Sequence, residues 1–116
     1  MSLKIEEQIK DDVAILTLHG NMLAPDTNKL SERVRDLVEE HINKIVIDLH
    51  GIKRMNSAFG LGVLMTCFFI LNRAGGQLRL ANLTNKELKI LQITKLDHIF
   101  ELYKNVEDAV KSLNKE

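Results

Sequence analysis

A serine stands where a strand-like segment gives way to a strongly apolar helical segment. Ser57 lies in the stretch 55–64, which follows the β-branched run 45–49 after a short loop. A hydroxyl at a helix start can accept a hydrogen bond from a backbone N–H that has no partner within the helix. The same exposed N–H groups and the helix dipole also favour a bound anion. Ser57 is therefore predicted to be either a helix cap or the acceptor of a regulatory phosphate.

The remaining groups that could perform catalysis or hold a metal form no recognisable pattern. The four histidines lie far apart in the sequence, and none has metal-type spacing to a second histidine or to a cysteine. Asp48 ends a run typical of a buried strand. Because no second carboxylate stands near it in sequence, we expect it to bond the loop that follows. The histidines are His19, His41, His50 and His98.

The glycines after Ser57 do not form a nucleotide-binding loop. Gly60 and Gly62 come after the helix start, whereas a dinucleotide-binding loop joins a strand to its helix. The sequence also lacks a phosphate-loop lysine at this place. We therefore expect that the protein is not an enzyme and that it has no catalytic residue, metal ion or cofactor.

The hydrophobic pattern predicts several short strands. Residues 3–9 alternate and residues 13–18 form an apolar run, so the acidic turn Asp11-Asp12 between them predicts a hairpin. The continuous apolar run 45–49 is typical of a buried central strand. Two further strands are predicted at residues 77–81 and 99–103, the second at an edge of the sheet.

Helical signals separate these strands. Residues 23–26 include a proline and an early aspartate, which mark a helix start, and apolar residues then recur at helical spacing over 30–41. Residues 57–74 are apolar almost all round, so this helix should be heavily buried, and Gly75-Gly76 ends it. Two more helix starts are the capping-box pattern at 84–87 and Asn105.

The expected elements follow the order β-β-α-β-α-β-α-β-α. After the opening hairpin, strands alternate with helices, which favours right-handed crossovers and a parallel core. No linker, repeat or low-complexity tract interrupts the chain. We expect a single α/β domain over residues 1–116, with a small mixed sheet packed with about four helices.

Composition narrows the class of partner and the compartment. The 116 residues include 16 basic and 16 acidic side chains, so the chain lacks the positive surplus with which proteins bind nucleic acid. The apolar segment 59–71 is shorter than the roughly 20 residues of a membrane span. Cys67 is a single cysteine, and the early charges do not indicate a signal peptide. We expect a cytoplasmic protein with no nucleic-acid or membrane partner.

The residues at the start of the apolar helix resemble a known motif. Residues 45–49, 55–57 and 60–64 together resemble the STAS domain of bacterial anti-sigma factor antagonists. The usual motif of that family is Asp-Ser-Ser-Gly-Leu-Gly or Asp-Ser-Ala-Gly-Leu-Gly, after an isoleucine- or valine-rich strand that ends in Asp-Leu. The resemblance covers nearly the whole chain, including the hairpin, Gly75-Gly76 and the closing segment 96–100.

This resemblance implies a switch in protein binding. In that family the unphosphorylated antagonist binds an anti-sigma factor, a serine kinase of the histidine-kinase-like ATPase class, and so frees a sigma factor for transcription. The kinase phosphorylates the serine at the helix start, the complex dissociates, and a PP2C-type phosphatase resets the switch. Carried over to this chain, the phosphorylated residue is Ser57, with Asn56 in the place of the aspartate.

A phosphate at this place would act on the contact surface. It adds a charge of about −1.5 to −2, which weakens binding through repulsion and desolvation and leaves the protein folded. The expected partner-binding surface consists of Arg54, Met55, Asn56, Ser57, Ala58 and Phe59.

Two departures from the family motif leave a second hypothesis open. Asn56 keeps the shape of aspartate but loses its charge, and one extra residue lies between Ser57 and Gly60. Counting forward from Asp48 puts Ser57 at the acceptor place, whereas counting backward from Gly60 puts Ala58 there. We favour Ser57 because it is the only hydroxyl in the loop and a serine caps a helix well. The alternative is a STAS-like interaction or ligand-sensing module that is not phosphorylated.

Overall fold

The hairpin predicted at the N-terminus is present in the computed structural model, which describes residues 2–23 and 28–114 except for the side chain of Ser57. Strands β1 (Lys4–Lys10) and β2 (Val13–Met22) pair in antiparallel register, from Lys4 opposite His19 to Lys10 opposite Val13. Asp11 and Asp12 form the turn with φ of +53° and +66°. Two left-handed residues give a tight turn whose twist matches that of the strands.

Over residues 2–23 and 28–114 the sheet has five strands in the order β1-β2-β3-β4-β5, and every pair beyond the hairpin is parallel. The remaining strands are β3 (Lys44–Met55), β4 (Gln77–Ala81) and β5 (Glu101–Tyr103). The predicted α/β class, with a mixed sheet and, among the described residues, four α-helices, is therefore confirmed.

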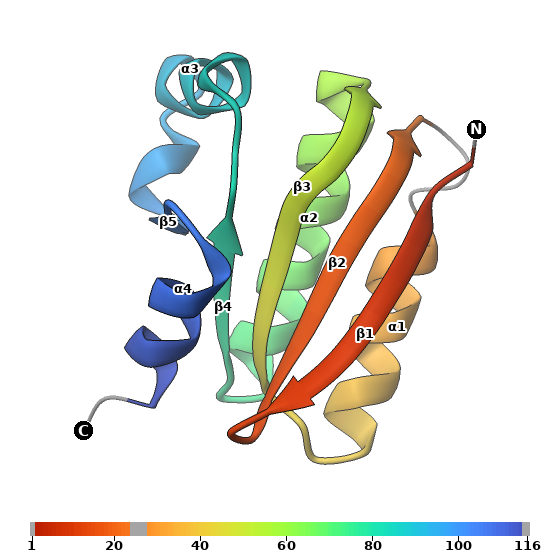
Figure 1. Cartoon of the computed structure of the whole chain (residues 1–116), viewed down its shortest axis with the longest axis vertical. Coiled ribbons are helices and arrows are strands. Elements are labelled where there is room, and N and C mark those ends of the chain that lie inside the picture. Colours follow the sequence, from red (N-terminus) through yellow and green to blue (C-terminus); the bar gives the residue numbers. More distant parts are fainter. Residues whose placement is uncertain (1, 24–27, 115–116) are drawn as a thin grey trace.

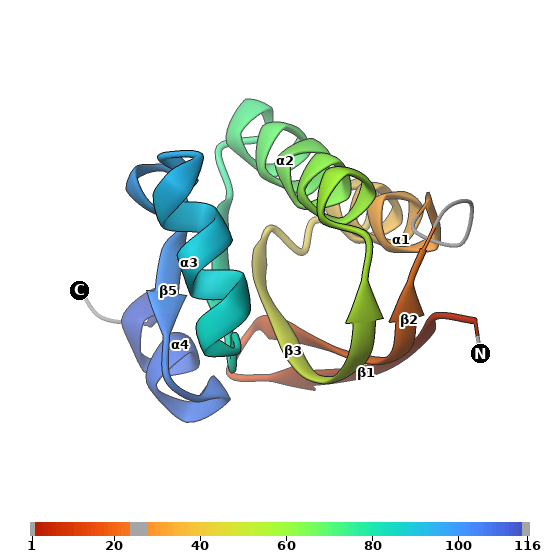
Figure 2. The ribbon, with the colours of Figure 1, turned by 90° about the horizontal axis from the view of Figure 1, so that it is seen from above.

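Helices cover both faces of the sheet. Helices α1 (Asn28–Glu39) and α2 (Ser57–Arg73) lie side by side on one face, and α4 (Val106–Leu113) packs on the other (Figures 1 and 2). Helix α3 (Asn85–Ile93) lies beyond the end of β4 and is followed by a 3-10 turn (Leu96–His98). Among the described helices, none is long and apolar enough to cross a membrane.

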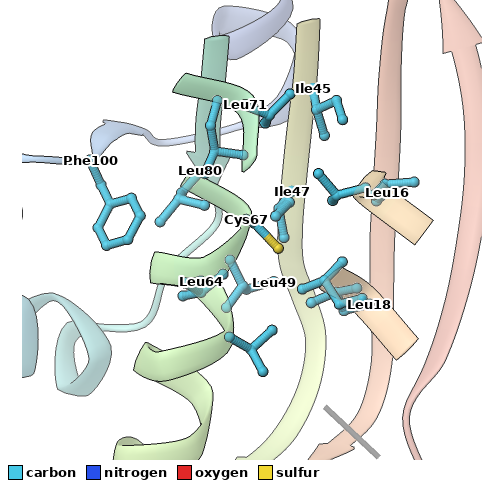
Figure 3. Close-up of a cluster of buried hydrophobic side chains, with 14 of the residues drawn as sticks. Leu16, Leu18, Ile45, Ile47, Leu49, Leu64, Cys67, Leu71, Leu80 and Phe100 are labelled. Atoms are coloured by element: carbon cyan, nitrogen blue, oxygen red, sulfur yellow. The ribbon is translucent and has the colours of Figure 1, made fainter. Parts of the chain in front are cut away.

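The main core fills the space between the sheet and the layer of α1 and α2. Figure 3 shows its central part, where leucine and isoleucine side chains of β2, β3 and β4 meet the inner face of α2. Leu64, Cys67 and Leu71 supply that inner face, and each is almost completely buried. The helix is less enclosed than its sequence suggests, because Phe59 and Phe69 are 50% and 53% exposed on its outer side.

Three boundaries differ from the predictions. The expected helix start at residues 24–26 lies outside the described residues, and α1 ends at Glu39, so His41, with φ of +67°, lies beyond it. Strand β3 does not end at residue 49 but continues to Met55. Residues 50–55 were expected to form a loop, because their sequence lacks a strand pattern. They are held instead by pairing with the end of β2.

Candidate functional site

The sheet divides into a fork at one end, and the candidate site lies there. Strands β3 and β4 pair only as far as Asp48 and Ala81. Beyond this pair β3 continues along β2 to Met55, whereas the chain leaving β4 turns away into α3 (Figure 1). The two branches therefore separate and leave a space between the end of β3 and the start of α3.

Two bulges shape the β3 branch of this fork. Between the pairs Thr17–Asp48 and His19–Gly51, β2 advances two residues while β3 advances three. A second shift follows Gly20, so the bulged strand contains two more residues than its partner over this stretch. Bulges bend a strand and increase its twist, which turns the end of β3 away from β4.

Asp48 holds the root of the fork together. Its side chain is 7% exposed, and its Oδ1 accepts hydrogen bonds from the backbone N–H of His50 and from Asn82 Nδ2, each at 2.9 Å. Its Oδ2 lies 3.5 Å from Thr17 Oγ1, which donates to it. The expectation that Asp48 bonds the following segment is confirmed, and the carboxylate also joins β2, β3 and the β4–α3 connection.

The start of α2 is capped by Asn56 and not by Ser57. Asn56 has extended backbone angles, and its Oδ1 accepts hydrogen bonds from the N–H groups of Ala58, at 3.0 Å, and Phe59, at 3.3 Å. Ser57 is thus the first residue of the helix. The expectation that Ser57 caps the helix is wrong, because the neighbouring asparagine is an equally good cap and occupies that position.

Most of the predicted partner-binding surface is accessible. Arg54, Asn56 and Ala58 are exposed, and Phe59 is half exposed beside them. Met55 is partly buried instead, with its side chain packed against Gly60 at the point where a Cβ atom would stand. The glycine of the motif thus makes room for Met55 within the protein, whereas Gly62 faces open space.

A groove of about 610 Å³ lies between the two branches of the fork, and we call it the β3–α3 groove. It includes Arg54, Met55 and Asn56 of the predicted surface, together with residues of α3 that the sequence did not indicate. Its other lining residues are Leu23, Ile52, Lys53, Thr84, Lys86, Glu87 and Ile90. A signal for this groove was available in the capping-box pattern at 84–87, since a helix start after β4 must lie near the end of β3.

The capping box of α3 fixes one wall of the groove. Glu87 N donates to Thr84 Oγ1 at 3.2 Å, and Thr84 N donates to Glu87 Oε1 at 2.8 Å. Glu87 is buried at 9% exposure, so its carboxylate is committed to this internal role. This wall is accordingly held in place before any partner arrives.

The other groups considered for chemistry are not brought together. Within the described part of the chain, no group of three or more histidine, cysteine, aspartate or glutamate side chains is placed to hold a metal ion. Cys67 is buried in the core, and this burial raises the pKa of its thiol to about 12. His19 lies over Gly51 on β3, with its Nε2 2.5 Å from Glu6 Oε1. These residues contribute to structure at separate places.

Comparison with known proteins assigns the family. The family model described as the STAS domain matches residues 4–109. An anti-sigma F factor antagonist from Paenibacillus polymyxa is 27% identical over 118 residues, covering 97% of each chain. The crystal structure of a putative anti-sigma factor antagonist from Thermotoga maritima has a TM-score of 0.87 at 25% identity, covering 96% of this chain and 95% of that one.

A more distant neighbour has been solved in two chemical states. The anti-sigma factor antagonist SpoIIAA in its unphosphorylated form has a TM-score of 0.76 at 14% identity, covering 99% of this chain and all of that one. The phosphorylated form from Bacillus has a TM-score of 0.72 at 15% identity, covering 96% and 98%. At these identities the likeness shows the fold alone. With the match over residues 4–109, the chain belongs to the STAS domain family.

Proposed function

We propose that this chain is a cytoplasmic anti-sigma factor antagonist whose binding to an anti-sigma factor kinase is switched by phosphorylation of Ser57. The observation that supports it most directly is the position of Ser57 as the first residue of α2, next to the exposed Asn56, Ala58 and Phe59. The names of the relatives in Paenibacillus and Thermotoga support the same class of protein. The partner contacts this surface, and its binding to the unphosphorylated chain frees a sigma factor.

The chemistry of the switch is a reversible phosphoryl transfer. The Oγ of Ser57 attacks the γ-phosphorus of ATP bound to the kinase, ADP leaves, and a base on the kinase takes the hydroxyl proton. A PP2C-type phosphatase then hydrolyses the ester and restores the serine with release of inorganic phosphate. Both reactions use the catalytic groups of the partners, which is consistent with a chain that supplies only the acceptor.

The structure at the start of α2 supports a switch in which phosphorylation of Ser57 changes the charge of the surface and leaves the fold unchanged. The N–H groups of Ala58 and Phe59 already have an acceptor in Asn56 Oδ1, so the helix does not need a phosphate to satisfy them. A phosphoserine adds a charge of about −1.5 to −2 where the helix dipole favours it. The modified protein therefore stays folded while its contact surface repels the kinase.

Phosphorylation with a candidate anti-sigma factor kinase from the same genome tests the proposal. The protein is incubated with the kinase and Mg-ATP, and the modified peptide is mapped by mass spectrometry. We expect one phosphate, on Ser57, that is lost in Ser57→Ala and kept in Thr66→Ala, which removes another hydroxyl of α2. No phosphate on Ser57, combined with no binding to the kinase in its ADP state, would contradict the proposed function.

A pair of substitutions separates charge from shape. Ser57→Asp should weaken kinase binding. Ser57→Asn introduces a side chain of nearly the same shape as aspartate but without the charge, so this variant should bind the kinase much more tightly than Ser57→Asp does. Both should melt within a few degrees of the wild type, because surface substitutions away from packed groups change stability by about 0.5 kcal/mol or less. Equal binding by the two variants would show that the switch does not depend on charge.

The alternative is an interaction or ligand-sensing module that is not phosphorylated, and one observation favours it. Ala58 is exposed in the first turn of α2, which is where the backward count from Gly60 puts the acceptor. Under this reading the same surface binds its partner constitutively. Kinase binding that is unchanged after incubation with Mg-ATP, with no phosphate on the chain, is the result that would favour it.

A further inference from the structure

The β3–α3 groove has a basic rim for which the described residues supply no neutralising carboxylate. Lys53 and Arg54 on β3 and Lys86 on α3 line it, and all three are exposed. In the described part of the chain, none of them forms an ion pair with a carboxylate. Glu87 is the one carboxylate among the lining residues, and its Oε1 accepts the N–H of Thr84 within the capping box.

Lys86 occupies a position that is electrostatically unfavourable within its own helix. It is the second residue of α3, between Asn85 and Glu87, where the positive end of the helix dipole favours an acidic side chain. A cation in the first turn therefore weakens the helix slightly. Local rules of this kind are commonly broken at functional sites, where the residue serves a contact outside its own element.

Apolar side chains also line the groove. Ile52 and Ile90 are partly buried on its two sides, and Leu23 at the end of β2 is 37% exposed. Ile52 packs against the main core, so its side chain is held in place. A volume of about 610 Å³ lies within the range of 300–1,000 Å³ that is usual for binding sites. The groove can therefore accept side chains as well as charge.

We infer that the β3–α3 groove binds an acidic segment of the anti-sigma factor partner. Carboxylates of that segment pair with Lys53, Arg54 and Lys86, and an apolar side chain enters between Ile52 and Ile90. The groove shares Arg54, Met55 and Asn56 with the surface around Ser57, so one partner covers both. This inference rests on the proposed function and extends it to α3, a helix that the sequence motif does not include.

Two lysines of α3 offer a matched test. Lys86 lines the groove, whereas Lys89, also exposed on α3, does not. Lys86→Glu places an acid in the first turn, which favours the helix, so reduced binding by this variant does not reflect unfolding. Affinity and association rate are measured for the full chain against the anti-sigma factor kinase used in the phosphorylation experiment, at two salt concentrations.

We expect Lys86→Glu to weaken binding by about tenfold, mainly through slower association, and to reduce the dependence on salt. Lys89→Glu should stay within about twofold of the wild type. Ile90→Ala and Ile93→Ala test the apolar part of the lining in the same way, because Ile90 lines the groove whereas Ile93 is 72% exposed and lies outside it. Only Ile90→Ala should accelerate dissociation.

The outcomes separate this inference from the proposed function. If the wild type binds the kinase and Lys86→Glu binds as well as Lys89→Glu, the groove is not part of the interface and the proposed function stands. If the wild type neither binds the kinase in its ADP state nor receives a phosphate on Ser57, both are contradicted; if it receives the phosphate but does not bind, only the inference is contradicted. Lys86-dependent binding of single-stranded DNA or of anionic phospholipid vesicles, with kinase binding indifferent to Lys86, would also overturn the inference by assigning the groove to another partner.

Discussion

The side-chain amide of Asn82 donates a hydrogen bond to Asp48 Oδ1 at 2.9 Å across the fork between β3 and β4. Asn82 follows β4 directly and has φ of +62°, in the left-handed region. The bond thus links a buried carboxylate in the central strand to the backbone turn that directs the chain into α3. Through this link the sheet determines where α3 begins.

This relationship predicts different stabilities for two substitutions of Asn82. Asn82→Ala and Asn82→Gly both remove the bond to Asp48, which should lower the free energy of unfolding by about 1–2 kcal/mol. The alanine variant should be less stable than the glycine variant by about 1 kcal/mol, because a left-handed conformation disfavours a Cβ atom. Urea unfolding measures both. Equal stabilities of the two variants would contradict the role of the left-handed turn.

The cap of α2 predicts that Asn56 matters more to stability than Ser57. Asn56→Ala should cost about 1 kcal/mol, because the N–H groups of Ala58 and Phe59 lose their acceptor. Asn56→Asp should be at least as stable as the wild type, since it keeps the acceptor and adds a charge that the helix dipole favours. Ser57→Ala, the control, should change the free energy of unfolding by less than about 0.5 kcal/mol. A larger loss in Ser57→Ala than in Asn56→Ala would contradict the assignment of the cap.

The two glycines of the motif should respond in opposite directions to alanine. A Cβ atom at Gly60 would collide with the side chain of Met55, so Gly60→Ala should be destabilising. A Cβ atom at Gly62 meets no atom within 4 Å. Gly62→Ala should therefore raise the free energy of unfolding by up to about 1 kcal/mol through helix propensity. Thermal unfolding compares the two variants.

A double variant provides the control for this prediction. Met55→Ala removes the side chain with which the new Cβ atom collides. Gly60→Ala should therefore lower the free energy of unfolding less in the Met55→Ala background than in the wild type. Additive losses would show that Met55 is not the reason for glycine at position 60.

The ion pair between Glu7 on β1 and Arg33 on α1 predicts a dependence of stability on pH. Arg33 Nε and Nη2 lie 2.5 and 2.7 Å from the two carboxylate oxygens, and these hydrogen bonds lower the pKa of Glu7 below its ordinary value of 4.5. The unfolded chain therefore binds a proton at Glu7 at a higher pH than the folded chain does. The stabilisation is present above pH 4.5 and is lost as the pH falls through the lowered pKa.

Comparison with Glu7→Gln isolates this contribution. At pH 7 the wild type should be more stable than Glu7→Gln by no more than about 1 kcal/mol, because the pair is partly exposed to solvent. The difference should shrink as the pH is lowered from 4.5 to 2.5, as measured by urea unfolding at each pH. A difference that stays constant over this interval would show that ionisation of Glu7 is not involved.

The order of elements was predictable because its signals are local. The apolar runs 13–18 and 57–74 and the capping box at 84–87 each involve neighbouring residues, and each gave the correct element. The extension of β3 was not predictable in this way. Residues 50–55 have no strand pattern of their own. Their extended conformation is fixed by pairing with β2, which lies more than 30 residues earlier in the chain.

The candidate site also combines a part that local sequence predicts with a part that depends on distant residues. The surface around Ser57 follows from a contiguous motif, but the groove beside it requires Lys86 and Ile90 of α3. Those residues reach the end of β3 only because β4 stops at Ala81 and the chain turns at Asn82. The assignment of the cap failed for a different reason: Asn56 and Ser57 are adjacent and both types cap helices well, so the sequence alone does not choose between them.

The hydrogen bonds of Asp48 have a thermodynamic consequence for recognition. They connect β3 to the β4–α3 connection at the point where the two branches of the fork separate. The caps Asn56 and Thr84 hold the starts of α2 and α3. If the proposed partner docks here, little backbone freedom remains to be lost in these segments, which keeps the conformational part of the entropic cost small on this side of the complex. Under the proposed function, such a surface would associate as a rigid body, and phosphorylation of Ser57 would adjust its affinity through charge while its shape is kept.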